Sequence, residues 1–141
     1  MSLKRLFLKY KCDKYFHKYH LVYEKFFLKI KNDKLKILEI GVSDGASLRC
    51  WSNYFKKSEI IGFDIKSINL KKKQIFKKNI HVYKGSQTDQ KFLNFLIKKY
   101  KKFDVIIDDG SHKPSDVIKS FKILFNSLSK NGLYFVEDTQ T

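Results

Sequence analysis

The chain has 141 residues, 43% of them hydrophobic, so it can bury a core and is expected to form one domain. Its formal net charge is +16, but only Arg5 and Arg49 among its 30 cationic residues are arginines. Specific recognition of phosphates and bases depends on arginine, so the composition argues against a dedicated nucleic-acid reader. The excess of lysine, with abundant Asn, Ile, Phe and Tyr, instead fits the residue bias of an AT-rich genome. Attraction to acidic glycans, lipids or nucleic acid stays open.

Cysteine usage and the lack of long apolar stretches bear on the compartment. Cys12 and Cys50 belong to no CxxC or Cys/His motif, so we expect reduced thiols in a cytoplasmic protein. Lysine interrupts residues 1–11 too often for a signal peptide, and no stretch is apolar over the length of a membrane span.

The first predicted element is a helix over residues 15–30. Its aromatic and aliphatic residues recur at helical spacing, which predicts a stripe that packs on the domain or on a partner subunit. The stripe consists of Phe16, Tyr19, Tyr23, Phe26, Phe27 and Ile30. His17 and His20 in this helix could line a site, or could be ordinary surface and core-edge histidines.

A strand over residues 37–42 then runs into a glycine turn and a helix. The spacing is Glu39-x-Gly41-x-x-x-Gly45, which differs from the G-x-G-x-x-G of nicotinamide enzymes. A strand, a glycine turn and a helix in this order place backbone N–H groups and the positive end of a helix beside a ligand.

The second strand, residues 59–65, carries an acid near its carboxyl end. Asp64 lies 23 residues after Gly41. In doubly wound nucleotide-binding folds this position accepts hydrogen bonds from ribose hydroxyls. The alternative is a helix cap or turn former. The acid and the glycine turn together favour a nucleotide-like cofactor.

Residues 66–79 predict a short basic surface helix, followed by a third strand over 80–84. The polar residues after this strand again lie at a carboxyl end, where Gln87 could read a purine edge. They could equally cap the predicted helix 90–100.

Two later strands end in carboxylates. Residues 103–112 read FDVIIDDGSH, which predicts a buried strand that delivers Asp108, Asp109 and His112 to one place. A helix over 114–128 follows, and residues 132–138, GLYFVED, form another strand that ends in Glu137 and Asp138. These acids and the imidazole could gather around a hard cation.

Strand and helix patterns alternate five times along the chain. An open, mostly parallel α/β sheet with right-handed crossovers satisfies this pattern. The unusual polar clusters then fall at strand carboxyl ends, where ligands bind in such sheets.

Several motifs resemble the class I S-adenosylmethionine-dependent methyltransferases. These are LEIGVSDGASL, IIGFDI, IDDGSH and GLYFVEDTQT. IDDGSH with a following Glu-Asp is similar to the narrower, metal-dependent macrocin and mycinamicin O-methyltransferase group and its cephalosporin-hydroxylase-like relatives. DKYFHKYHLVYEKFF resembles that group's Asp-Lys, His-x-Tyr and Tyr-Glu signature, with Tyr15 in place of a usual glycine.

The resemblance implies a Rossmann-like fold with strand order 3-2-1-4-5. It divides the chain into an N-terminal helical segment, 1–34, and an S-adenosylmethionine-binding domain, 35–141. The family continues through a further helix and an antiparallel strand pair, which the sequence lacks. The fifth strand would then be an exposed sheet edge, so self-association into a homo-oligomer is expected.

The resemblance also implies residue roles. Gly41 and Gly45 would shape the turn around the methionine part of S-adenosylmethionine, with support from Glu39. Asp64 would hold the ribose, and three further residues would lie on the cofactor side: Ser86, Gln87 and Asp108. Asp109, Glu137 and Asp138 match the Mg²⁺ ligands of the group, and His112 matches its general base.

Three function classes follow. The leading one is an Mg²⁺-dependent O-methyltransferase acting on a hydroxyl of a sugar, glycan or natural product, because such a hydroxyl needs a cation and a base to lose its proton. A nucleic-acid methyltransferase is favoured only by charge, so no specific nucleic acid is expected. The third class is a non-catalytic cofactor-binding remnant or partner subunit.

Overall fold

The computed structural model describes residues 1–67 and 77–139. It contains one five-stranded sheet in the order β3-β2-β1-β4-β5, and every pairing in it is parallel. The strands are β1 Lys36–Ile40, β2 Glu59–Asp64, β3 Ile80–Lys84, β4 Phe103–Asp108 and β5 Leu128–Val136. This order and the alternation of strands with helices confirm the predicted α/β fold.

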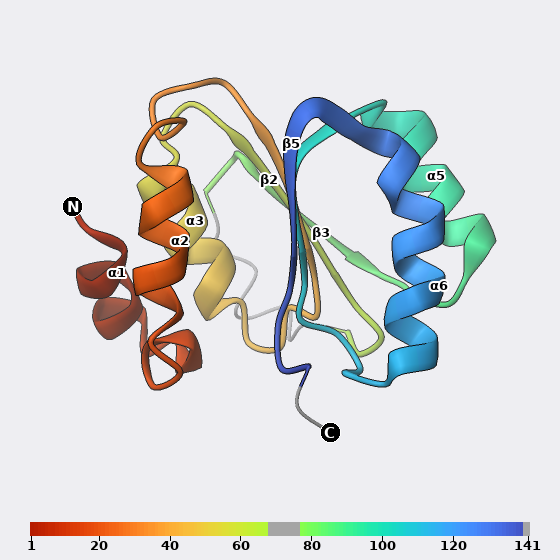
Figure 1. Ribbon diagram of the computed structural model, residues 1–141, viewed down its shortest axis with the longest axis horizontal. Helices are drawn as coiled ribbons and strands as arrows, with labels where there is room; N and C mark the ends of the chain where they lie inside the picture. The colour runs from red at the N-terminus through yellow and green to blue at the C-terminus, as the bar shows by residue number, and fades with distance from the viewer. Residues whose placement is uncertain (68–76, 140–141) are drawn as a thin grey trace.

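Helices cover both surfaces of the sheet (Figure 1). One layer holds α1 Leu3–Tyr10, the short 3₁₀ helix η1 Asp13–Tyr15, α2 Tyr19–Phe27 and α3 Ala46–Tyr54. The other holds α5 Gln90–Tyr100 and α6 Pro114–Leu124, which continues into the 3₁₀ helix η2 Phe125–Ser127. The central strands β1 and β4 are buried between the layers, as expected of strands with near-continuous apolar runs.

Each face of the sheet has its own core. In the core beneath the N-terminal helices, Trp51 is fully buried and meets the rings of Phe7, Tyr23 and Phe27 edge to face. The core beneath α5 and α6 is mainly aliphatic, with Leu93, Leu96 and Leu124 against the sheet. The N-terminal helices thus pack on the same core as the sheet.

The helical prediction for the N-terminus needs correction. A helix that the sequence did not indicate, α1, begins after Ser2, whose side chain accepts a hydrogen bond from the Arg5 N–H. Leu3, Leu6 and Phe7 are buried at helical spacing, and Lys4 and Arg5 between them are exposed. The predicted helix 15–30 is shorter and starts at Tyr19, because Lys18 adopts a left-handed conformation.

The boundaries of the last predicted helix and strand also differ from the observed ones, and one predicted helix falls largely outside the described residues. The predicted helix 114–128 ends at Leu124, and β5 starts at Leu128 rather than at Gly132, because Leu128 already pairs with Phe103 before a register shift. The basic helix predicted for 66–79 falls largely outside the described residues. Within the described part of the chain, no helix has the length and apolarity needed to cross a bilayer.

Candidate functional site

The carboxyl ends of the strands surround a cavity of about 370 Å³. Backbone hydrogen bonds fix the strand ends that form it: Asp109 N–H donates to the Ile40 carbonyl at 2.9 Å, and Glu137 N–H donates to the Asp108 carbonyl at 2.9 Å. Each bond extends the sheet by one residue beyond a strand end. The acids that follow β4 and β5 are therefore held at the edge where ligands bind in such folds.

Seven of the eleven predicted site residues line this cavity. They are Gly41, Asp64, Ser86, Gln87, Asp109, His112 and Asp138. Glu39, Gly45, Asp108 and Glu137 do not belong to its wall among the described residues. His17 and His20, which could have lined a site, also lie away from it.

The glycine turn is built as the sequence indicated. Gly41 has φ +82°, and a Cβ added there would collide with the backbone carbonyl of Asp109. Glycine at this position therefore lets the end of β1 touch the segment after β4. Glu39 lies fully buried below, where its Oε2 accepts hydrogen bonds from Ser47 Oγ at 2.7 Å and Trp51 Nε1 at 3.1 Å. Glu39 thus ties α3 to β1 beneath the cavity.

Asp64 organises the same turn. Its Oδ2 accepts hydrogen bonds from the backbone N–H groups of Val42 and Ser43, both at 2.9 Å, and its Oδ1 accepts one from Lys66 N–H at 2.9 Å. Carboxylate oxygens can accept further bonds. Asp64 therefore shapes the turn while its carboxylate borders the cavity.

The residues on the other side of the cavity form a buried network. Gln87 is buried. Its Oε1 accepts a hydrogen bond from Ser111 N–H at 2.7 Å, and its Nε2 donates one to Asp108 at 3.3 Å. Asp108 is 1% exposed and also accepts a bond from Ser120 Oγ at 2.7 Å. Asp108 therefore holds Gln87 from behind the cavity wall. Burial raises the pKa of Asp108.

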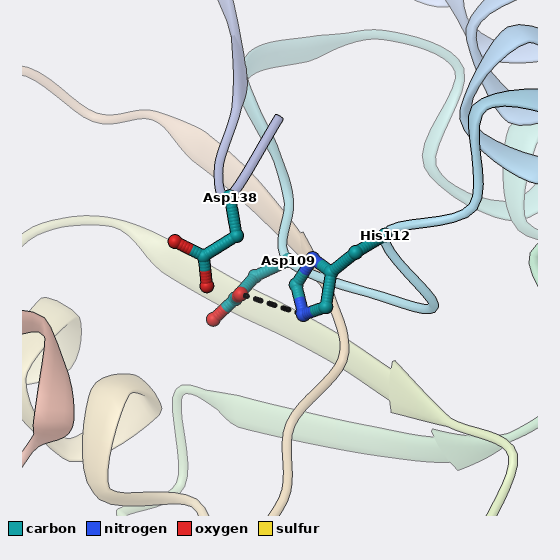
Figure 2. Close-up of side chains that lie close together, drawn as sticks. All are labelled: Asp109, His112 and Asp138. Carbon is teal, nitrogen blue, oxygen red and sulfur yellow. Dashed lines mark ion pairs between the residues drawn. The ribbon is translucent and has the colours of Figure 1, made fainter. Parts of the chain in front are cut away.

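Asp109, His112 and Asp138 meet at the mouth between β4 and β5 (Figure 2). One potential ligand atom from each lies within 4.8 Å of the other two, and His112 Nε2 is 3.8 Å from Asp109 Oδ1. His112 and Asp138 both have positive φ, 60° and 50°. Such conformations are uncommon outside glycine and gather at functional sites. The two carboxylates at this spacing suit a small divalent cation, and the imidazole lies directly beside them.

The predicted ligand Glu137 does not belong to this group of three, and protein donors occupy its oxygens. Its Oε1 accepts a hydrogen bond from the Tyr23 hydroxyl, and its Oε2 accepts one from Lys14 Nζ at 2.7 Å. The side chain is only 5% exposed. Each of its oxygens retains a lone pair, so a cation could still share Glu137, but no oxygen of this residue is free of a protein donor.

Lys14 was not predicted as a functional residue, although it is central to the site. Its ammonium group is 2% exposed and contacts Asp109, Glu137 and, at 3.3 Å, Glu39. Burial lowers the pKa of Lys14, but the three carboxylates outweigh it and raise the pKa well above 10.5. Burial raises the pKa values of all three acids, while Lys14 lowers them. The Asp-Lys pair of the family signature was the available signal for Lys14.

The cavity wall is acidic although the chain is strongly basic. Five aspartates line it, and no lysine or arginine does among the described residues; the five are Asp13, Asp64, Asp109, Asp116 and Asp138. Because like charges repel and opposite charges attract over these short distances, the cavity favours positively charged ligands over phosphates.

A family model described as a methyltransferase domain matches residues 38–139. The chain belongs to this methyltransferase family. The resemblance inferred from the motifs is thereby confirmed.

Similar proteins with assigned activities are O-methyltransferases by name. Mycinamicin VI 2''-O-methyltransferase of Micromonospora griseorubida is 36% identical over 126 residues, which cover 84% of this chain and 31% of that enzyme. Demethylmacrocin O-methyltransferase of Streptomyces fradiae is 35% identical over the same length and coverage. MycE methyltransferase, solved with Mg, SAH and mycinamycin VI, superposes with a TM-score of 0.90 at 33% identity, covering 98% of this chain and 39% of that chain. The chain spans about a third of the length of the curated relatives.

Proposed function

We propose that this chain carries the catalytic site of an S-adenosylmethionine- and Mg²⁺-dependent O-methyltransferase whose acceptor is a hydroxyl of a sugar, glycan or other natural product. The observation that carries the proposal is one acidic cavity whose wall includes Gly41 of the glycine turn and Asp64 together with Asp109, His112 and Asp138. The names of two relatives, an O-methyltransferase of a rhamnosyl tetracenomycin and one of an olivosyl-oleandolide, support the acceptor class.

The cofactor half of the cavity suits S-adenosylmethionine. Asp64 and the backbone after Gly41 would receive the ribose and methionine portions, Gly45 would complete the turn, and Ser86 and Gln87 would border the adenine. S-adenosylmethionine supplies an electrophilic methyl group on a positively charged sulfur. The acidic wall would stabilise that charge, whereas it would repel a polyphosphate.

The donor atoms also suit Mg²⁺. Asp109 and Asp138 would bind it, and Glu137, held one residue away, is the predicted third ligand. A carboxylate oxygen of Asp109 and one of Asp138 already lie within 4.8 Å of each other, so both could hold a small cation that prefers oxygen ligands. Mg²⁺ supplies a positive charge that lowers the pKa of a bound hydroxyl.

His112 is the proposed general base. Its side chain is 39% exposed at the mouth, where an acceptor would enter, and Asp109 3.8 Å away would stabilise the imidazolium. The acceptor oxygen would attack the methyl carbon in line, forming a C–O bond while the C–S electron pair stays on sulfur. A ring nitrogen of His112 would take the hydroxyl proton.

Labelled methyl transfer tests the proposal. The protein is incubated with isotopically labelled S-adenosylmethionine and a panel of deoxysugar glycosides, with Mg²⁺ or with EDTA, and products are identified by mass spectrometry. We expect labelled product and S-adenosylhomocysteine with Mg²⁺ and neither in EDTA. Equal turnover in EDTA would overturn the metal assignment. Failure of S-adenosylhomocysteine to bind in calorimetry would overturn the cofactor assignment.

A further inference from the structure

Three side chains of the N-terminal segment contact the two acids that follow β5. Lys14 Nζ donates to Glu137 Oε2 at 2.7 Å, and the Tyr23 hydroxyl donates to Glu137 Oε1. The Tyr19 hydroxyl donates to Asp138 Oδ1 at 2.6 Å. We call Lys14, Tyr19 and Tyr23 the N-terminal clamp. It joins residues more than 110 positions apart in the sequence.

Within the clamp, Tyr19 contacts Asp138 twice. β5 ends at Val136, and the last sheet-like backbone bond is made by Glu137 N–H. Asp138 lies beyond it with φ 50°, and its backbone N–H donates to the Tyr19 hydroxyl at 3.3 Å. One tyrosine hydroxyl therefore bonds both the backbone and the carboxylate of Asp138.

The clamp is rigidly supported. The Tyr23 ring is 2% exposed and packs on Phe135 of β5 with centroids 4.9 Å apart and on Trp51 at 5.1 Å. Fixed donors of this kind orient carboxylate ligands around a cation.

We propose that Lys14, Tyr19 and Tyr23 are positioning residues that set Glu137 and Asp138 for binding a divalent cation, a role that rests on the proposed function. All three residues lie before residue 38, where the match to the methyltransferase domain begins. The N-terminal segment is then a part of the metal site, supplied from outside the matched domain.

Conservative tyrosine variants test this role. Tyr19→Phe and Tyr23→Phe each remove one hydroxyl, and Tyr54→Phe is the matched control, because the buried Tyr54 hydroxyl has no hydrogen-bond partner among the described residues. Binding of Mn²⁺ is measured from the electron paramagnetic resonance signal of the free ion, and thermal unfolding is measured in EDTA. We expect Mn²⁺ affinity to fall by about 10- to 100-fold in the two clamp variants. The control should bind Mn²⁺ like the wild type.

The Mn²⁺-binding results distinguish failure of the positioning role from failure of the proposed metal-dependent function. Wild-type Mn²⁺ affinity in Tyr19→Phe and in Tyr23→Phe would overturn the positioning role, even if the unfolding temperature fell, because a merely structural tyrosine would give that pattern. An equal loss of affinity in Tyr54→Phe would overturn it as well. If the wild type bound no Mn²⁺ at all, the proposed metal-dependent function would fail first. If Tyr23→Phe does not fold, the half-buried Tyr19 still provides the test.

Discussion

Replacing Lys14 by methionine removes the one cation held among three carboxylates beneath the cavity. Methionine keeps an unbranched apolar stem of similar length, so the substitution changes charge more than packing. The ammonium group is 2% exposed, and the side chains of Glu39, Glu137 and Asp109 around it are 0%, 5% and 20% exposed. Water can therefore do little to replace the lost positive charge.

Removing one partner of a buried ion pair costs about 3–5 kcal/mol, because the remaining charge is left uncompensated. The three carboxylates would share this cost by taking up protons, so we expect a loss of unfolding free energy in that range for Lys14→Met. A domain of this size is stable by about 5–15 kcal/mol. The change should lower the unfolding temperature by about 10–20 °C.

Urea denaturation at pH 7 in EDTA measures the change. Lys119→Met is the matched control, because Lys119 is exposed on α6, and it should change stability by less than about 0.5 kcal/mol. Adding Glu39→Gln to Lys14→Met should recover part of the loss, since it removes one of the unpaired charges. A Lys14→Met protein as stable as the control, with no coupling to Glu39, would refute the electrostatic account of this cluster.

The remaining predictions concern the cavity. Asp64→Ala should weaken S-adenosylhomocysteine binding by at least about 1.5–3 kcal/mol in calorimetry, since it removes a charged acceptor and releases two N–H groups of the turn; unchanged affinity would exclude Asp64 from the site. His112→Ala should keep Mn²⁺ binding but slow methyl transfer by about 10²- to 10⁴-fold. Asp109→Ala should lose Mn²⁺ binding and methyl transfer together. Equal Mn²⁺ affinity in the two variants would contradict this assignment. Burial raises the pKa of Glu39 from 4.5 to about 7, so the folded state binds an extra proton between these values and stability should fall as pH rises from 4.5 to 7. Glu39→Gln should flatten that part of the pH profile, and an unchanged slope would assign it to other groups.

The strand-end chemistry could be predicted because it follows from local pattern. An apolar run that ends in Asp109 and His112 is typical of a buried strand with polar residues at its carboxyl end. Parallel strands bring such ends together at one edge of the sheet. Asp64 and Gly41 followed from the same argument. For these residues, spacing along the chain determines position in space.

Lys14 could not be predicted in this way. In a chain with 30 cationic residues, a single buried lysine has the same local pattern as many exposed ones. Its burial depends on Glu39 and Glu137, which come from two other strands. The helix α1 was missed for a related reason, because the two cationic residues between Leu3 and Leu6 made an amphipathic pattern look polar. The direction of Glu137 depends on Lys14 and Tyr23, so it could not be predicted before they were placed.

The net charge of the chain and the charge of its cavity have opposite signs, and the difference bears on function. A charge of +16 describes mainly exposed lysines, whose attraction to anions is screened by salt over about 10 Å. The cavity wall carries five aspartates, and the nearest buried cation, Lys14, is already paired with three carboxylates beneath it. A ligand in the cavity therefore meets a negative field despite the basic surface. That field favours a sulfonium cofactor and a divalent cation and disfavours a phosphodiester backbone, so the basic composition is weak support for nucleic acid as the methyl acceptor.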